Sequence, residues 1–433
     1  MKRRSIRFLA LLLILGLLAG CAQEQMPTTS SLAPDSMPPV SSSSLPDQNF
    51  SETPSSQSEK PVSPAYSFMP AGSVQQVDTS GIEKVNSTIR QDQEPRWELP
   101  WIVSIEDGYV FTENIHPGVT VTRYDLDGQD AAVRLSFEME VMDPEELTLS
   151  KDKMVFAPCN YDAETGFYFT TITLLDFAAE QVSALYTDSV AVYDVECAGL
   201  NENDFAFFYI DTQAMQRVMV YDDAAGCSAL YEAPFPQGEE DSERIFSICC
   251  AEENIYILVR RTTAGESRLH CLCMDREGQL LWDRALDVLE KYTDPDYSID
   301  QITVCGKYLL IKFYSCGNLP QFAALRLDED EIRALDIPKQ YPCWELTSEP
   351  VDGRYFVFTL FPDHMNYLKG SYSSDIAIFD MVTEQWTLAK LLDNDNKEIG
   401  VSCSSDGQLI FCDRNVSIRE EWFTADLNDI VAE

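Results

Sequence analysis

Residues 245–282, IFSICCAEENIYILVRRTTAGESRLHCLCMDREGQLLW, decide the fold of this 433-residue chain. Apolar runs at 245–249 and 280–282 flank two longer ones, of which the first begins at Asn254 and the second ends at Asp275. Short runs rich in β-branched and aromatic residues, separated by polar turn residues, are typical of β-strands joined by hairpins. This stretch therefore predicts one antiparallel unit of four short strands.

The same unit recurs along the chain. A turn followed by an apolar strand occurs at 108–111, 153–156, 204–207, 254–257, 307–310, 354–357 and 407–410. After each comes a strand that ends in aspartate, at Asp125, Asp176, Asp222, Asp275, Asp328, Asp380 and Asp426, with spacings of 51, 46, 53, 53, 52 and 46 residues. A short apolar strand follows most of these aspartates.

Seven near-equal units of four strands predict an all-β fold, a seven-bladed β-propeller of four-stranded antiparallel blades over residues 96–433. A blade this small cannot bury both of its faces alone, whereas stacked blades cover one another. Few residues follow Asp426, so we expect the segment 74–103 to supply the outer strand of the seventh unit. Helical periodicity, which an α/β fold requires, is absent.

The unit around Asp275-Arg276-Glu277-Gly278-Gln279-Leu280-Leu281-Trp282 resembles the quinoprotein-type propeller repeat, in which Asp-x-x-Gly-x-x-x-Trp closes a hairpin. Residues 124–128 repeat it in part, and the other five units lack it. The resemblance therefore concerns hairpin design. We interpret the recurring aspartate as an acceptor for backbone N–H groups in the turn between the last two strands of a blade.

The amino-terminal residues indicate where the protein works. Lys2, Arg3, Arg4 and Arg7 precede the apolar run 8–18, which has the layout of a secretory signal. Leu18-Ala19-Gly20-Cys21 resembles the lipobox of bacterial lipoproteins. The resemblance implies that residues 1–20 are removed and that Cys21 carries the lipid, placing the protein on the extracytoplasmic face of the cell membrane. A plain secretory signal, or a single membrane span, is the alternative.

Residues 21–95 are interpreted as a disordered tether between the lipid and the folded domain. Residues 22–64 contain 12 Ser and 8 Pro, which cannot build a core. Without residues 1–20 the chain has 27 basic and 72 acidic residues, a formal charge of −45. Such a surface repels nucleic acid and anionic lipid. We therefore expect no nucleic-acid partner, and a membrane link through the lipid at Cys21 alone.

The sequence predicts no catalytic, cofactor or metal site. There is no nucleophile elbow, and three histidines are too scattered for a triad. In His270-Cys271-Leu272-Cys273, strand alternation sends both cysteines to one face and His270 and Leu272 to the other. Residues 393–398 depart from a calcium loop. The adjacent Cys249 and Cys250 also point to opposite faces, and Cys403 with Cys412 is the single disulfide candidate.

A long loop, expected at 359–374, is the candidate surface for a partner. Its aromatic, apolar and histidine side chains include the five candidates for partner contact, Phe361, His364, Tyr367, Leu368 and Tyr372. A loop this long and this apolar is unusual for a mere connection, and the alternative is a loop that folds on its own side chains over the blade edge. We predict a non-catalytic binding or scaffold protein for a protein, peptide or saccharide. The alternative is a propeller enzyme, a glycan hydrolase or lyase with axial carboxylates.

Overall fold

The computed structural model describes residues 75–77, 83–84 and 101–431, the last range without 115–117, 127–129, 138–141, 163–166, 191–194, 237–240, 288–297, 306–307, 315–321, 327–331, 335–342, 347–353, 362–374, 384, 391–398, 404–406 and 414–421. All described residues belong to one compact unit, Ser67–Glu433.

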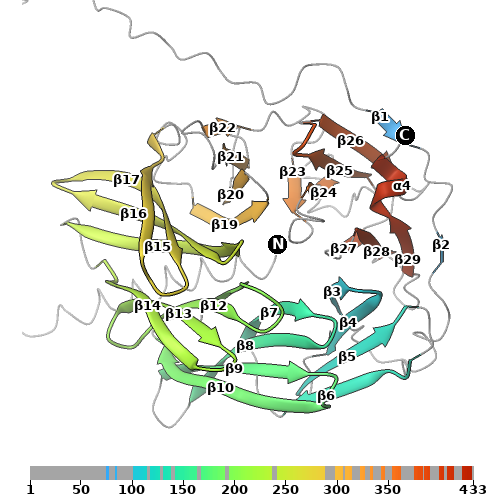
Figure 1. Cartoon of the computed structure of the whole chain (residues 1–433), viewed down its shortest axis with the longest axis horizontal. Helices are drawn as coiled ribbons and strands as arrows, with labels where there is room; N and C mark the ends of the chain where they lie inside the picture. Colours follow the sequence, from blue (N-terminus) through green and yellow to red (C-terminus); the bar gives the residue numbers. More distant parts are fainter. Residues whose placement is uncertain are drawn as a thin grey trace, which may run out of the picture. The chain divides into compact units, whose positions relative to one another are not determined.

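The described strands form seven sheets, in which chain neighbours pair antiparallel. Five of these sheets each contain four consecutive strands (Figure 1). They are β3–β6 (Trp101–Glu106, Tyr109–Asn114, Val119–Asp125, Val133–Phe137), β7–β10 (Met142–Ser150, Lys153–Asp162, Phe167–Asp176, Gln181–Val190), β11–β14 (Glu196–Gly199, Phe205–Ile210, Met215–Asp222, Gly226–Pro234), β15–β18 (Ser242–Ala251, Asn254–Thr263, Glu266–Asp275, Leu280–Ala285) and β19–β22 (Ser298–Cys305, Tyr308–Tyr314, Phe322–Arg326, Ile332–Ala334).

The other two sheets each take a strand from the beginning of the described chain. One contains β23–β26 (Cys343–Leu346, Tyr355–Phe361, Asp375–Asp380, Gln385–Lys390), with β1 (Gln75–Val77) added parallel to β26. The other contains β27–β29 (Ile399–Cys403, Gln408–Asp413, Trp422–Asp426), with β2 (Glu83–Lys84) antiparallel to β29. As the sequence predicts, a segment from 74–103 therefore completes the last sheet. The parallel strand β1 was not expected.

Each sheet contacts the next, and the last contacts the first. The first strands β3, β7, β11, β15 and β19 meet in succession, and β27 meets β3. The two remaining junctions are made by side chains. The ring of Tyr308 in β20 lies edge-on to that of Phe379 in β25, with centroids 6.5 Å apart. Leu409 of β28 joins a buried cluster with Tyr355 and Ile376. Antiparallel sheets that contact one another in a closed cycle define a β-propeller.

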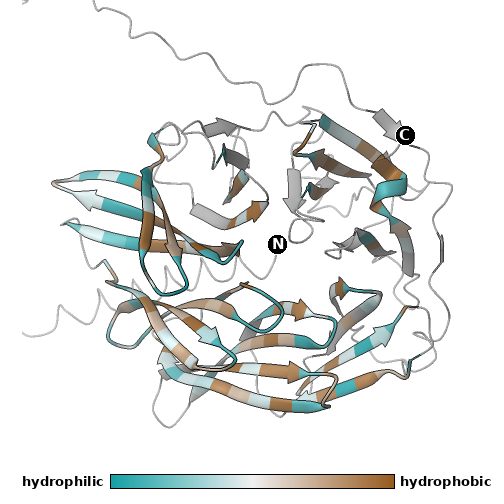
Figure 2. Ribbon diagram, in the orientation of Figure 1, coloured by the Kyte–Doolittle hydropathy of each residue, from teal (hydrophilic) through white to brown (hydrophobic). Residues whose placement is uncertain are grey.

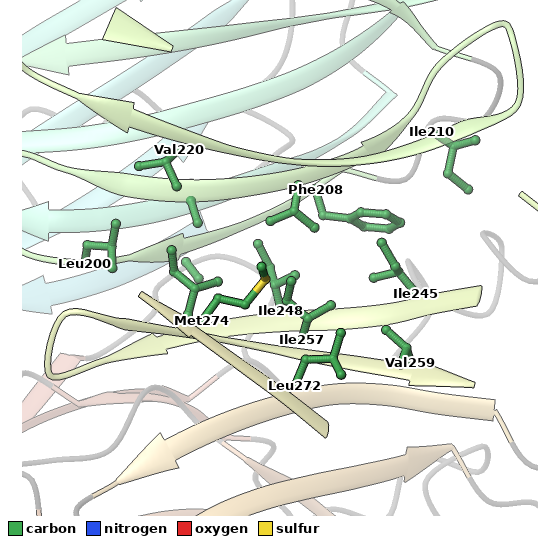
Figure 3. Close-up of a cluster of buried hydrophobic side chains, with 14 residues drawn as sticks. Leu200, Phe208, Ile210, Val220, Ile245, Ile248, Ile257, Val259, Leu272 and Met274 are labelled. Carbon is green, nitrogen blue, oxygen red and sulfur yellow. The ribbon is translucent and has the colours of Figure 1, made fainter. Parts of the chain in front are cut away.

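The hydrophobic core consists of layers between neighbouring sheets. Figure 3 shows the layer between β11–β14 and β15–β18, where Phe208 and Val220 face Ile248 and Ile257. A second layer covers the opposite face of β15–β18 and includes Leu258, together with residues of β19 and β20. The hydropathy colours of Figure 2 show apolar residues along the strands and polar residues at many hairpin ends. Both faces of the sheet β15–β18 are therefore covered by neighbours, as the blade prediction requires.

The recurring aspartate has the structural role that the sequence predicts. It accepts backbone N–H bonds from the segment that follows the third strand, which is a turn in five sheets and the first turn of α4 (Leu427–Val431) after Asp426, because a carboxylate there satisfies amides that no strand can pair. The bonds run from Asp130 N to Asp125 (2.8 Å), Ala179 N to Asp176 (2.8 Å), Ala224 N to Asp222 (2.9 Å), Gln279 N to Asp275 (2.7 Å), Val382 N to Asp380 (2.9 Å) and Asn428 N to Asp426 (2.8 Å). The seventh aspartate, Asp328, lies outside the described residues.

The predicted disulfide between Cys403 and Cys412 is wrong. The hairpin register pairs Cys403 with Leu409 and Cys412 with Gly400. The two cysteines are therefore three positions apart in the ladder, whereas a cross-strand disulfide requires residues directly opposite one another. The predicted start of the long loop at Thr359 is also wrong, since β24 continues to Phe361.

Candidate binding site

The predicted partner loop lies almost wholly outside the described residues. This holds for His364, Tyr367, Leu368 and Tyr372, and also for the predicted lipid site Cys21. The remaining member, Phe361, is the last residue of β24, where its backbone pairs with Cys343 of β23.

Polar side chains of the first strands connect neighbouring sheets. The Glu196 carboxylate of β11 accepts hydrogen bonds from the Ser247 hydroxyl (2.6 Å) and the Ile248 backbone N–H (3.1 Å), both of β15. The Ser247 hydroxyl accepts one more, from the Ile302 N–H of β19 (3.0 Å). Ser104 of β3 and Thr148 of β7 are bonded through their hydroxyls. Glu196 and Ser247 therefore bridge three successive sheets.

Arginine–carboxylate pairs make further bridges at the turns. Arg276, just after β17, contacts Asp204 (2.7 Å), Asp222 (3.1 Å) and Glu253 (3.0 Å), so that it joins two sheets. Burial of Asp204 raises the pKa of its carboxyl. The hydrogen bonds from Asn201, the Asp223 amide and Arg276 outweigh burial and hold that pKa below its ordinary value. Asp204 is thus ionised at neutral pH and acts as a structural acceptor.

A connected polar network spans β15–β18. Arg261 donates to Glu243 and Asp283, and Asp283 also bonds Nδ1 of His270 at 2.7 Å. Burial raises the pKa of Asp283. The hydrogen bonds from Arg261 and His270 lower it by more, so the pKa of Asp283 lies below its ordinary value. His270, the histidine of the predicted His-Cys-Leu-Cys strand, therefore pairs with a carboxylate.

Strand alternation places the cysteines as predicted. Cys271 and Cys273 lie in the layer toward β19 and β20, whereas Leu272 lies in the layer toward β11–β14. Cys249 and Cys250 likewise contribute to different layers. Burial raises the pKa of Cys273 to about 11, so this thiol is protonated at neutral pH. Within the described ranges, no group of three or more His, Cys, Asp or Glu side chains is placed to hold a metal ion.

Two arginines on β15 and β16 form an arrangement that the sequence analysis missed. Arg244 and Arg260 lie opposite each other in the ladder. Their guanidinium carbons stand 5.0 and 5.1 Å from the ring centre of Phe246, and that of Arg244 is also 5.7 Å from the Phe235 ring. We call these four residues the arginine–phenylalanine cluster. The signal that could have found it is the occurrence of Arg244, Arg260 and Arg261 within one unit of an acidic chain.

The fold is similar to the β-propeller domains of solved proteins. One solved structure, from a study of two prolyl endopeptidases, gives a TM-score of 0.50 at 11% sequence identity. The match covers 77% of this chain and 47% of that chain. A post-proline cleaving enzyme from Rickettsia typhi gives 0.49 at 11% identity, covering 79% and 53%. The β-propeller domain of the Trilobed protease from Pyrococcus furiosus gives 0.42 at 12% identity, covering 64% and 78%.

This chain therefore spans about half the length of the first two peptidases. At such identities the likeness is one of fold alone. No protein-family model and no curated protein matches the sequence. Within the described residues, no helix combines the length and apolar character needed to cross a membrane.

Proposed function

We propose that this chain is a lipid-anchored, extracytoplasmic β-propeller of seven blades that acts as a non-catalytic binding or scaffold protein. The seven sheets and their cyclic contacts support the blade number. The lipobox-like sequence ending at Cys21 supports the anchor, and the Ser- and Pro-rich residues 22–64 would carry the propeller clear of the membrane, whereas β1 and β2 belong to the propeller's own sheets.

One observation favours binding over catalysis. Among the residues that the structure describes, several carboxylates are engaged as structural acceptors. Glu196 accepts a hydrogen bond from Ser247 of β15, and Asp204 accepts one from Arg276. The recurring aspartates accept hydrogen bonds from turn amides, as Asp275 does from Gln279. A general acid or base must keep a lone pair or a proton available for the substrate. Side chains committed to backbone amides and arginines serve that role poorly.

The partner surface is proposed at the loop that follows β24. Aromatic side chains bury large areas at low entropic cost and dominate interface energies when they enter a partner's pocket. The partner is a protein, peptide or saccharide of neutral or positive charge, because the acidic surface repels anionic macromolecules.

The anchor is tested by comparing the wild-type chain with Cys21→Ala in cells. Wild-type protein should incorporate a fatty-acid analogue and sediment with membranes, because the acyl chains supply the membrane affinity. The variant should do neither. A variant that remains labelled and membrane-bound would contradict lipidation at this residue.

The partner surface is tested by crosslinking in the same cells. The double variant Tyr367→Ser/Leu368→Ser should lose the crosslinked products of the wild type, with thermal stability within about 1 kcal/mol, as for exposed substitutions generally. Phe361 is left intact because it belongs to β24. Tyr161→Ser is the matched control, since this tyrosine is 54% exposed on another sheet. Unchanged crosslinks in the double variant would exclude the loop.

A further inference from the structure

Each sheet of the propeller ends in an outer strand, and the far edge of that strand faces away from the rest of the sheet. An unpaired edge of this kind is a template for pairing with another chain. Two features protect several of these edges. The strand β1 pairs with the far edge of β26, and the outer strands β22 and β2 contain only three and two residues. Covered edges and very short edges do not readily recruit a further strand.

The outer strands β10, β14 and β18 are protected in a different way. Each contains one extra residue relative to the strand beside it, namely Leu185, Leu230 and Leu281. Such a β-bulge bends the strand and increases its twist, so the edge loses the regular shape that a further strand needs. An aromatic residue follows directly in all three strands. The bulge is therefore a repeated feature of three successive sheets.

The outer strand β6 of the first sheet has neither a cover nor a bulge. It pairs with β5 in an unbroken register, from Val133 opposite Arg123 to Phe137 opposite Val119. It has five residues, and no described strand pairs with its far edge. Figure 1 shows β6 as the last strand of its sheet. Among the outer strands that the structure describes, β6 thus presents the one regular, uncovered edge of more than three residues.

The side chains beside this edge differ between the two faces of the sheet. Toward the sheet β7–β10, Val133 and Phe137 are partly buried at the border of the apolar layer, and Val182 of β10 lies at the same border. Arg134 and Ser136 point to the opposite face, because side chains alternate along a strand, and both are exposed. A strand added here would therefore meet apolar and polar side chains at alternate positions.

We propose that the far edge of β6 binds an extended peptide segment of a partner protein, which adds to the first sheet as a fifth strand. The sheet β23–β26 provides the precedent, because β1 is a fifth strand on its outer edge. Residues of the segment on the face toward β10 are apolar, and they complete the burial of Val133 and Phe137. The residue opposite Arg134 is acidic, because opposite charges stabilise a cross-strand pair.

A second copy of this chain is a poorer occupant of the edge. Two copies that each have a formal charge of −41 repel each other, whereas a partner segment with one acidic residue is only weakly repelled. The inference rests on the proposed binding function. It adds a contact that is separate from the loop after β24, and it narrows the partner at this contact to an extended peptide.

The test measures the fluorescence anisotropy of a labelled, capped peptide, Ser-Val-Thr-Val-Glu-Val-Ser, with the full chain in detergent. Wild type should bind the peptide. Arg134→Glu should weaken binding by about fivefold or more, because an attractive cross-strand pair becomes repulsive. The same variant should bind a peptide with Lys in place of Glu more tightly than wild type does.

Arg268→Glu is the matched control for the charge change. It reverses the charge of another exposed arginine, which lies on the inner strand β17. Long-range repulsion of the peptide is therefore the same in both variants, and the cross-strand pair is lost in one of them. The control should leave peptide affinity within about twofold of wild type.

A second readout separates strand addition from charge attraction. A strand at a sheet edge directs every other backbone N–H group toward its neighbour. Two further peptides carry N-methyl groups, one on its three valines and the other on its threonine and glutamate. One of them should lose binding, and the other should keep it. If both bind as tightly as the parent peptide, no backbone ladder forms and the inference is overturned.

Three other results would overturn it. These are no binding of the peptide to wild type, unaltered affinity in Arg134→Glu, and a wild-type dimer in sedimentation that Arg134→Glu dissociates. The dimer would assign the edge to a second copy of this chain. None of these results affects the loop after β24, because its crosslinks are measured without the peptide. Failure of this inference and failure of the proposed function are therefore distinguishable.

Discussion

At the scale of single residues, the Arg354–Asp380 pair shows how this protein uses its acidic side chains. Arg354 donates two hydrogen bonds to the Asp380 carboxylate, at 2.9 and 2.6 Å, and the Val382 amide donates a third at 2.9 Å. Burial raises the pKa of Asp380, but these donors outweigh it, so the pKa lies below its ordinary value. Asp204, Asp211 and Asp283 are shifted in the same direction.

The lowered pKa values of these buried carboxylates predict that the folded state becomes less stable in acid. A carboxylate whose pKa is lower in the folded state stabilises the fold at pH above its unfolded value, about 3.9. The contribution is lost as the pH falls through the folded-state pKa. The free energy of unfolding, measured by urea denaturation, should therefore be lower at about pH 3 than at about pH 7. Asp380→Asn should lower it at neutral pH by about 1–3 kcal/mol and reduce its pH dependence.

Asp176→Asn is the control for this prediction. Asp176 accepts the Ala179 amide in the corresponding turn, but it is half-buried, unlike the buried Asp380, and no arginine bond to it is present in the described structure. Asp176→Asn should therefore lower the free energy of unfolding by less than Asp380→Asn does. If the two variants lose the same free energy of unfolding, the contribution comes from the hydrogen bonds to turn amides and not from the Arg354–Asp380 ion pair.

At the scale of the element, the hairpin between β17 and β18 shows why one turn needs glycine. Gly278 has a φ of +84°, a region that residues with a Cβ rarely adopt. A Cβ added there would also lie 3.3 Å from the Leu230 carbonyl oxygen of the neighbouring sheet. The glycine of the Asp-x-x-Gly repeat therefore serves both the turn and the contact between sheets.

Gly278→Ala should destabilise the protein more than Gly226→Ala. Gly226 has a similar φ of +81°, but nothing lies within 4 Å of an added Cβ. Both variants bear the conformational cost of about 1–2 kcal/mol, and only the first must also displace a backbone carbonyl. Thermal denaturation followed by circular dichroism would measure the difference. Equal melting temperatures would show that the neighbouring sheet yields without cost.

Element by element, most strands of the propeller could be predicted because two local signals agree. Period-2 apolar runs mark the strands, and an aspartate that accepts turn amides marks where the third strand ends. Pairing register could not be predicted in the same way. The Cys403–Cys412 proposal failed because a shift of the turn moves every pair in the hairpin.

The arginine–phenylalanine cluster was missed for a related reason. Arg244 and Arg260 are 16 positions apart in the sequence, and they meet because of the register between β15 and β16. A bulge between Ile245 and Ser247 shifts that register. A bulge inserts one residue without a distinctive sequence pattern, so composition shows the arginines but not their juxtaposition.

At the scale of the whole molecule, two strands from the beginning of the described chain cover the outer edges of the last two sheets. β2 pairs with the last strand of the final sheet, and β1 pairs with β26. Without them, β29 and β26 would each present an unpaired strand edge, which is a template for association with another chain. The parallel pairing of β1 could not be predicted, because three residues carry no recognisable pattern.

Deleting residues 67–84 should therefore lower the melting temperature and promote aggregation, because it removes both β1 and β2 and exposes these two edges. Deleting residues 22–66 is the matched control. That deletion removes a larger segment, but one whose Ser- and Pro-rich composition provides little apolar surface to bury, so the melting temperature should stay at the wild-type value. Circular dichroism and light scattering would follow both variants. If they melt alike without aggregation, β1 and β2 contribute nothing to stability or to protection of these edges, and the sheets hold together through their apolar layers alone.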